Sequence, residues 1–273
     1  MHSQAKYHSI RPIIRLTHGR HRWRSREWTV FFGLAILWFA LGGRAVEVAN
    51  SRVESDFSAA QAAVAATNSV VHRWQLARAA FDLADVTPRE KEKARLAEIG
   101  RAASRAALLE SPANAPAHYY LALCSGELAQ AKAVGGLRLI HEIQSEFEAA
   151  RVLDETFDHA GPDRGLGLLF LEAPGWPTSV GDRKKARAHL ERAVVLAPEY
   201  PENRLTLLDL LVRIKDHRGA VAQMAVIESM WSKAKAQLTG EEWASAWRDW
   251  EHRKTVLGGK VLKLSNKTSV VPR

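Results

Sequence analysis

Beyond Arg44 the apolar residues of this chain recur at the spacing of helices. No stretch there alternates apolar and polar residues with an excess of β-branched side chains, which is the pattern that strands need. Alanine and leucine dominate instead, and both are strong helix formers. The pattern predicts helices over residues 56–84, 88–109, 114–134, 137–153, 163–172, 183–196, 201–215, 218–236 and 241–255. Helices joined by short loops predict an all-α fold.

Capping residues, glycine and proline mark the ends of several of these helices. Thr87 supplies an N-cap hydroxyl, Pro88 stands at the first helical position and Glu90 completes a capping box. The pair Gly135-Gly136 predicts a break between two helices. Residues 173–182, which contain two prolines and two glycines, predict a shaped loop.

Pairs of short helices with similar stop signals indicate an internal repeat. The tetratricopeptide repeat has a period of roughly 34 residues, and its second helix carries alanine, a bulky apolar residue, alanine and proline at fixed spacing. That spacing is matched by Ala186, Leu190, Ala193 and Pro198. We therefore predict tetratricopeptide-like helical hairpin repeats, stacked as an α-solenoid, over residues 50–257. A basic, flexible tail is expected at 258–273.

An earlier and weaker unit ends at Pro112. Ala107 is correctly placed in it, but Gly100 and Ser104 occupy the other two positions. Pro112 and Pro198 lie 86 residues apart, which is two periods of roughly 34 with about 18 residues left over. We expect an insertion to hold the excess, either within residues 135–166 or in the 173–182 loop.

Positive charge gathers at the N-terminus. The chain has a net charge of +9, and residues 1–27 contribute +6 of it through seven basic residues and one acid. The remaining residues therefore carry +3, so nucleic acid is not an expected partner. An uncharged apolar run, residues 28–43, follows directly. A basic leader before an apolar run is typical of an export signal.

The apolar run is interpreted as either a cleaved signal peptide or a signal anchor. As a helix it would span about 24 Å, short of the roughly 30 Å hydrocarbon core of a bilayer. The excess of basic residues places the N-terminus in the cytoplasm under both interpretations. The body would then be periplasmic, tethered to the inner membrane by the uncleaved helix or released after cleavage. A buried core helix with a basic tail is the alternative.

Residues 118–203 contain further recognisable elements. They comprise HYYLAL, GPDRGLGLLFLEAPGWPTSVGD and KKARAHLERAVVLAPEYPEN. This region, about a third of the chain, resembles the T component of tripartite ATP-independent periplasmic (TRAP) transporters and related exported bacterial proteins, most distinctively between Gly161 and Asp182. The resemblance implies a helical, exported protein that associates with the transporter's solute-binding protein and handles small organic ligands.

Stacked helix pairs leave a groove lined by the first helix of each pair, which is the usual binding surface of such arrays. With repeat starts at Ala115 and Pro201, the positions expected to face this groove are Tyr119, Glu127, Glu202, Asp209 and Arg213. An ordinary solvated helix face is the alternative interpretation.

Tryptophans offer two further candidates. Trp176, between two turn prolines, could present an aromatic anchor to a partner, although a packing role between repeats is favoured. Trp243, Trp247 and Trp250 recur on one face of the last helix. We interpret that stripe as the cover of the end of the array rather than as a ligand cage.

Enzyme classes lack their residues in this sequence. HExxH, a glycine-rich phosphate loop and GxSxG are absent, and Cys124 is the single cysteine, so neither a metal nor another cofactor is expected. We expect a non-catalytic exported protein that binds a protein partner. A general scaffold for envelope complexes and a periplasmic hydrolase with an unrecognised site are the alternatives, and a homo-oligomer is left open.

Overall fold

The computed structural model describes residues 36–131, 136–175 and 178–268, with side chains from residue 51 to residue 264 of these ranges. Its helices are α1 (Ile36–Ala66), α2 (Val70–Val86), α3 (Glu90–Glu110), α4 (Ala115–Ala131), η1 (Gly136–Leu139), α5 (Ile140–Leu153), α6 (Phe157–Glu172), α7 (Arg183–Leu196), α8 (Pro201–Arg213), α9 (His217–Gln237), η2 (Glu241–Trp243) and α10 (Ala244–Thr268). Within these ranges the β-structure is limited to a bridge between Gly175 and Gly181. The predicted all-α class is confirmed.

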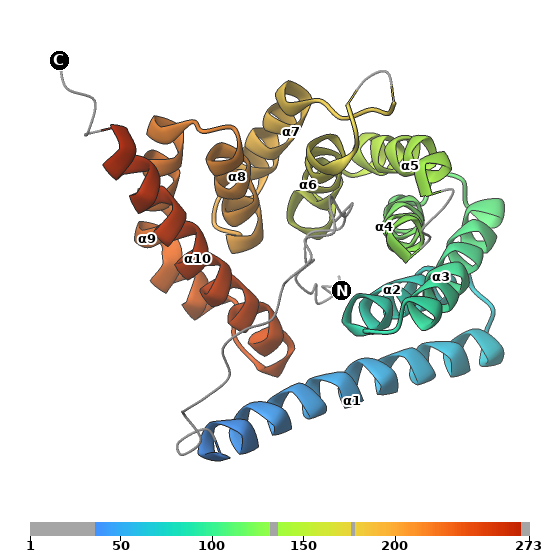
Figure 1. The fold of residues 1–273 in the computed structure, drawn as a ribbon. Helices are drawn as coiled ribbons and strands as arrows, with labels where there is room; N and C mark the ends of the chain where they lie inside the picture. The colour runs from blue at the N-terminus through green and yellow to red at the C-terminus, as the bar shows by residue number, and fades with distance from the viewer. Residues whose placement is uncertain (1–35, 132–135, 176–177, 269–273) are drawn as a thin grey trace, which may run out of the picture.

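The helices follow an arc, with α2, α4, α6, α8 and α10 on its inner side and α3, α5, α7 and α9 on its outer side (Figure 1). Each inner helix from α2 to α8 packs against the outer helix that follows it and against the next inner helix. The long helix α1 packs along α2. Helix pairs that contact only neighbouring pairs are typical of solenoid arrays.

The repeat of this array is 43 residues long. Helices α3, α5 and α7 end at Glu110, Leu153 and Leu196, so successive ends are 43 residues apart (110 to 153 and 153 to 196). Fully buried alanines recur with the same period at Ala107, Ala150 and Ala193. The 86 residues between Pro112 and Pro198 are therefore two whole repeats. The predicted period of 34 with an insertion is wrong, because every unit is longer rather than one unit being interrupted.

Small residues let neighbouring helices approach one another, as the repeat pattern predicted. Ala186, Leu190 and Ala193 are completely buried. Gly100, which weakened the match of the earlier unit, lies at the position equivalent to Ala186, and an added Cβ there would collide with the sulfur of Cys124 on α4. Gly100 is therefore a point of close contact between α3 and α4.

Two helix boundaries near the start of the array differ from the sequence prediction. The helix predicted over 56–84 is two helices, because the chain turns after Thr67 and the Ser69 hydroxyl accepts a hydrogen bond from the backbone N–H of His72 to begin α2. Thr87 does not cap α3. Its hydroxyl donates to the carbonyl oxygen of Leu83 at 2.6 Å and thereby closes α2. The predicted capping box is wrong because the preceding helix uses the threonine.

The C-terminal end is more ordered than the predicted tail. Helix α10 continues to Thr268, and Leu257 and Val261 are buried, so a flexible tail from 258 is wrong for the residues described. Trp243, Trp247 and Trp250 are buried on the face that packs onto the array, which confirms their role as its cover.

The N-terminal predictions fall largely outside the described residues. The leader 1–27 lies there, as does the first half of the apolar run 28–43, since α1 is described from Ile36. Among the helices that the structure describes, none combines the length and apolar character required to cross a membrane.

Candidate interaction site

The first turn of α6 has an unusual backbone. Asp158, His159 and Ala160 all have left-handed conformations, with φ values of 49°, 53° and 62°. Such a conformation costs about 1–2 kcal/mol for each residue other than glycine. Three in succession require contacts from the surrounding structure to hold them in place.

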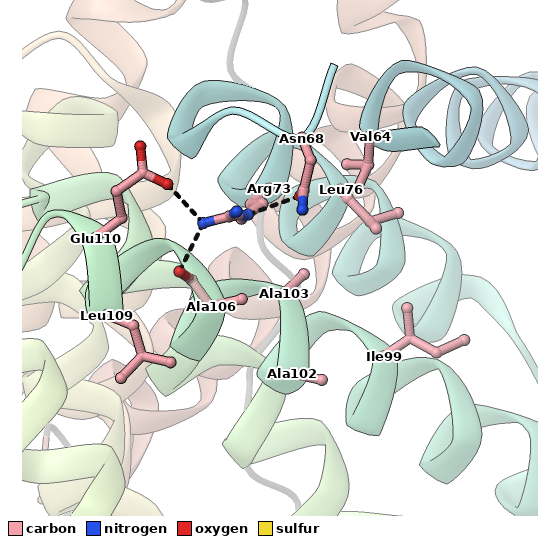
Figure 2. Close-up of a pocket in the computed structure, with 10 residues that line it drawn as sticks. All are labelled: Val64, Asn68, Arg73, Leu76, Ile99, Ala102, Ala103, Ala106, Leu109 and Glu110. Atoms are coloured by element: carbon pink, nitrogen blue, oxygen red, sulfur yellow. Dashed lines mark hydrogen bonds and ion pairs between the residues drawn. The ribbon is translucent and has the colours of Figure 1, made fainter. Parts of the chain in front are cut away.

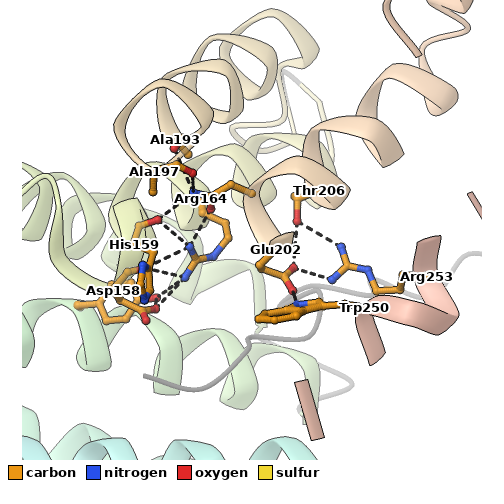
Figure 3. Close-up of polar contacts among 11 residues, drawn as sticks. Asp158, His159, Arg164, Ala193, Ala197, Glu202, Thr206, Trp250 and Arg253 are labelled. Carbon is orange, nitrogen blue, oxygen red and sulfur yellow. Dashed lines mark hydrogen bonds and ion pairs between the residues drawn. The ribbon is translucent and has the colours of Figure 1, made fainter. Parts of the chain in front are cut away.

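Arg164 supplies most of these contacts (Figure 3). Its guanidinium is completely buried and donates to the Asp158 carboxylate at 2.7 Å and to the carbonyl oxygens of Asp158 and His159 at 3.2 Å. It also donates to the side-chain oxygen of Asn203 on α8 at 2.9 Å, and the Asn203 amide donates back to the carbonyl oxygen of His159. The hydroxyl of Tyr119 on α4 donates to the Asp158 carboxylate. The turn is thus the polar junction of three inner helices.

His159 extends from this junction toward the end of the array. Its ring stacks on Tyr200 with ring centroids 4.2 Å apart, and it meets the edge of Trp243 at 6.3 Å. Burial lowers the pKa of His159, although the Asp158 carboxylate opposes the shift. The left-handed turn therefore aims a neutral imidazole into the aromatic cluster beneath α10.

A second buried group fixes α10 to α8 (Figure 3). The Glu202 carboxylate accepts hydrogen bonds from the indole N–H of Trp250 at 2.8 Å, from Arg253 at 2.6 Å and from the hydroxyl of Thr206 at 3.0 Å. Burial by itself would raise the pKa of Glu202, but the charge and hydrogen bond of Arg253 outweigh it and the net shift is downward. Glu202 is therefore an ionised anchor for the last helix.

Three predicted groove residues are not accessible to a partner. Tyr119 and Glu202 are completely buried in the contacts just described, and Glu127 is buried and paired with Lys93 at 2.9 Å. The prediction that they line an open groove is wrong for these side chains. These side chains are buried because α4 and the start of α8 are covered on nearly every side by neighbouring helices. Their polar groups join helices to one another.

The other two predicted groove residues on a helix, Asp209 and Arg213, lie on an accessible surface. Arg213 is 42% exposed and pairs with Asp209 at 2.7 Å and with Glu172 of α6 at 2.5 Å. The three side chains form an ion-paired strip between the C-terminal ends of two inner helices. Trp176, the remaining predicted residue, lies outside the described residues.

The structure also contains an open pocket that the sequence analysis did not foresee (Figure 2). Its volume is about 620 Å³, and it lies between the end of α1, the first half of α2 and the second half of α3. It is lined by Val64, Asn68, Arg73, Leu76, Ile99, Ala102, Ala103, Ala106, Leu109 and Glu110. Arg73 is held at one end by Asn68, Glu110 and the carbonyl oxygen of Ala106, which leaves the walls mainly apolar.

The 43-residue repeat explains why this groove is open. At the position of Ala103, the next units carry Glu146, which bonds His118 at 2.6 Å, and His189, which bonds Asp163 at 2.7 Å. These long side chains tie the outer helix to the inner helix.

Two more lining positions on α3 each correspond to a charged, bridging side chain in one of the later units. At the position of Ile99, the second unit has Glu142, which pairs with both Arg101 and Arg105 and so joins α5 to α3. At the position of Ala106, the third unit has Arg192, which pairs with Asp163 at 3.0 Å. The first unit has apolar residues at all three positions, and the Arg73–Glu110 pair bridges its groove only at one end. An alignment of the units at 43 residues would have revealed the difference.

A metal-binding cluster and a reactive cysteine are two features that could support catalysis in the part of the chain that the structure describes. It contains no group of three or more His, Cys, Asp or Glu side chains placed to hold a metal ion. Cys124 is buried, and burial raises the pKa of its thiol far above the ordinary range.

Comparisons with known proteins agree with a tetratricopeptide-like array. Residues 53–157 match the family model described as regulator of microtubule dynamics protein 1-3. This range covers less than half of the chain and contains the pocket. The chain is also similar in structure to TTC0263, a thermophilic TPR protein of Thermus thermophilus, with a TM-score of 0.53 and 18% sequence identity over 75% of this chain and 95% of that one. No curated protein matches the sequence.

Proposed function

We propose that this protein is a non-catalytic scaffold whose first repeat binds an apolar side chain of a partner protein in the pocket between α1, α2 and α3. The tetratricopeptide-like fold is a scaffold suited to protein–protein interaction. The observation that carries the proposal is that the first unit has alanine and isoleucine where the second and third units carry polar side chains that bridge helices, so its groove is bridged only at one end, by Arg73 and Glu110.

The pocket favours an apolar occupant. Its floor is made of alanine methyl groups and the side chains of Leu76 and Ile99, and Leu109 at its edge is 87% exposed. Arg73 donates from Nε and Nη1 to Asn68, Ala106 and Glu110 within the chain. A leucine- or phenylalanine-sized side chain on a helical or extended segment would remove this apolar surface from water, at about 25 cal/mol for each Å² buried.

Filling the pocket tests the proposal. Ala106→Trp places an indole in the groove, and Ala188→Trp adds the same indole to an exposed position on α7 outside it. After crosslinking in native cells and quantitative mass spectrometry, partners should be depleted with Ala106→Trp and retained with Ala188→Trp. Both variants should melt like the wild type. Equal recovery of every partner by the wild type and Ala106→Trp would refute the pocket.

A second contact is proposed at the ion-paired strip of Glu172, Asp209 and Arg213. Its support is that Asp209 and Arg213 are the accessible members of the predicted groove set that the structure describes. Reversing both charges together should weaken partner capture without unfolding the domain. Unchanged capture would show that the strip is not part of the interface, and it would not count against the pocket.

We also propose that the body works outside the cytoplasm, tethered to the inner membrane or free in the periplasm. The support is the +6 leader followed by the uncharged run 28–43. A phosphatase reporter that folds only outside the cytoplasm, fused after Arg273, should be active. Activity confined to a cytoplasmic reporter would refute export.

A periplasmic solute-binding protein is the proposed partner. This rests on the resemblance of Gly161 to Asp182 to the T component of TRAP transporters. Recovery of a solute-binding protein in the crosslinking experiment would support it, and recovery of envelope assembly proteins would favour a general scaffold. Hydrolysis of ester, peptide or phosphate substrates by the purified protein well above background would refute the non-catalytic role.

A further inference from the structure

The outer helices present the same four solvent-exposed positions in successive units. On α3 these positions hold Glu98, Ala102, Arg105 and Leu109. On α5, 43 residues later, they hold His141, Ser145, Glu148 and Val152. A spacing of four, three and four residues keeps the members of each set on one face of a helix.

Each set ends in a large apolar side chain that is unusually exposed. Leu109 is 87% exposed, Val152 is 78% exposed and the equivalent Val195 of α7 is 76% exposed. Single exposed apolar residues are common, but here one recurs at the same place in three successive units. The recurrence makes an apolar row along the C-terminal ends of the outer helices.

The charges on α3 and α5 complement one another. Arg105 is 52% exposed and occupies the position that Glu148 occupies on α5. Glu142, which lies between the two helices, pairs with Arg105 at 2.8 Å and holds its guanidinium over this face. Opposite charges at equivalent positions meet when the two helices are laid side by side in parallel.

We propose that this face binds a second copy of the chain. A two-fold axis parallel to the helices, between α3 and α5, places α3 of one copy against α5 of the other. Arg105 then faces the partner's Glu148, Leu109 faces the partner's Val152, and Ala102 faces the partner's Ser145. Every contact occurs twice because the interface is symmetric. Both faces curve outward, so the contact is confined to two neighbouring helices, α3 and α5.

The charges favour a two-fold axis between α3 and α5 over a two-fold axis through α5. A two-fold axis through α5 would also set Leu109 against Val195 and Arg105 against Glu191. It would, however, bring Glu148 against its own copy, and like charges in direct opposition are unfavourable. The register between α3 and α5 has no such opposition among the four positions. This interface shares Ala102 and Leu109 with the pocket proposed above, so a second copy and a pocket-bound partner compete for the same surface.

A charge exchange tests the interface. Sedimentation velocity of the full chain should show a dimer at tens of micromolar protein. Arg105→Glu and Glu148→Arg should each weaken self-association by about tenfold or more, and the double variant should restore it to within about threefold of the wild type. Both side chains are on the surface, and melting curves of all three variants should be close to that of the wild type.

Glu191→Arg is the matched control, because it changes the same position one unit later. It should leave the dimer intact. A wild-type chain that is monomeric at 100 micromolar would overturn the proposal, as would a double variant that stays as weak as either single one. Loss of the dimer with Glu191→Arg but not with Glu148→Arg would overturn this register.

Discussion

At the scale of single residues, the polar groups inside the array decide how its helices meet. Asp158 and Arg164 are both buried, and each is the main charged partner of the other. A buried ion pair contributes little compared with an apolar pair of the same size, but the loss of one member leaves an uncompensated charge. The left-handed turn and its junction with α8 therefore depend on Arg164.

Arg164→Met should destabilise the protein by about 3–5 kcal/mol, because it leaves the Asp158 carboxylate buried without its cation and removes the donors to the turn. The matched control is Arg187→Met, which removes a 42% exposed arginine from pairs with Glu191 and Asp216 and should cost less than about 1 kcal/mol. Urea unfolding followed by circular dichroism measures both values. Similar losses for the two variants would contradict the role assigned to Arg164.

Asp82 provides a prediction about pH. Burial raises its pKa from 3.8 to about 6, Arg78 opposes the shift, and the charges of Asp158 and Asp56 reinforce it. The folded state therefore holds this proton more tightly than the unfolded state, so Asp82 lowers stability progressively as the pH rises from 3.8 to about 6. Above that range the full penalty remains.

Asp82→Asn cannot ionise, so it should raise the melting temperature at pH 7.5 by more than it does at pH 4. Thermal melts of the variant and the wild type at the two pH values measure the difference. Asp56→Asn, at a more exposed carboxylate on α1, should show a smaller dependence on pH. A gain with Asp82→Asn that is the same at both pH values would show that Asp82 has an ordinary pKa.

At the scale of elements, the end of α8 shows how one backbone conformation limits stability. Lys215 has a φ of 60°, and its N–H donates to the carbonyl oxygen of Val212, while the N–H of Asp216 donates to that of Leu211. These are the bonds of a Schellman motif, whose left-handed position favours glycine.

Lys215→Gly should therefore stabilise the protein by about 0.5–1 kcal/mol, since glycine adopts the left-handed conformation without the cost that Lys215 bears. Lys215→Ala removes the same side chain but keeps the cost, so it should bring no gain. Differential scanning calorimetry of the two variants separates the backbone effect from the side-chain effect. Equal melting points would mean that the turn is not strained.

The sequence allowed prediction of those elements that local signals define. The bounds 183–196 of α7 were predicted as observed, because Asp182 caps its start and Pro198 follows its end. The period was misjudged because the 34-residue pattern matched one unit and hid the recurrence of Ala107, Ala150 and Ala193. The left-handed turn has no glycine to signal it. Its shape is held by Arg164 of the same helix, by Asn203 on α8 and by Tyr119 on α4.

The candidate sites were harder to predict for the same reason. Helical spacing identified the side of α4 and α8 on which Tyr119 and Glu202 lie, but the number of neighbouring helices determined that both are buried. The pocket arises from the absence of long polar side chains in one unit. Such an absence is informative only after the other units have been aligned with it.

At the scale of the whole molecule, the array combines a regular body with an irregular first repeat. Polar contacts of Asp163 with His189 and Arg192 bridge the helices of a later unit. The first repeat replaces them with alanine and isoleucine and leaves an apolar pocket beside an exposed leucine. The central claim is that the protein is a scaffold and that it binds its partner at the apolar pocket of the first repeat.

Site-specific photocrosslinking tests that claim most directly. A photoreactive amino acid at Ala102, on the edge of the pocket, is compared in native cells with the same amino acid at Ala188, the equivalent position two units later. The account predicts a discrete crosslink from position 102 to a protein other than a second copy of this chain, which is absent from position 188 and is lost when Ala106→Trp fills the pocket. Crosslinks of the same pattern from both positions, or a position 102 crosslink unaffected by Ala106→Trp, would contradict it.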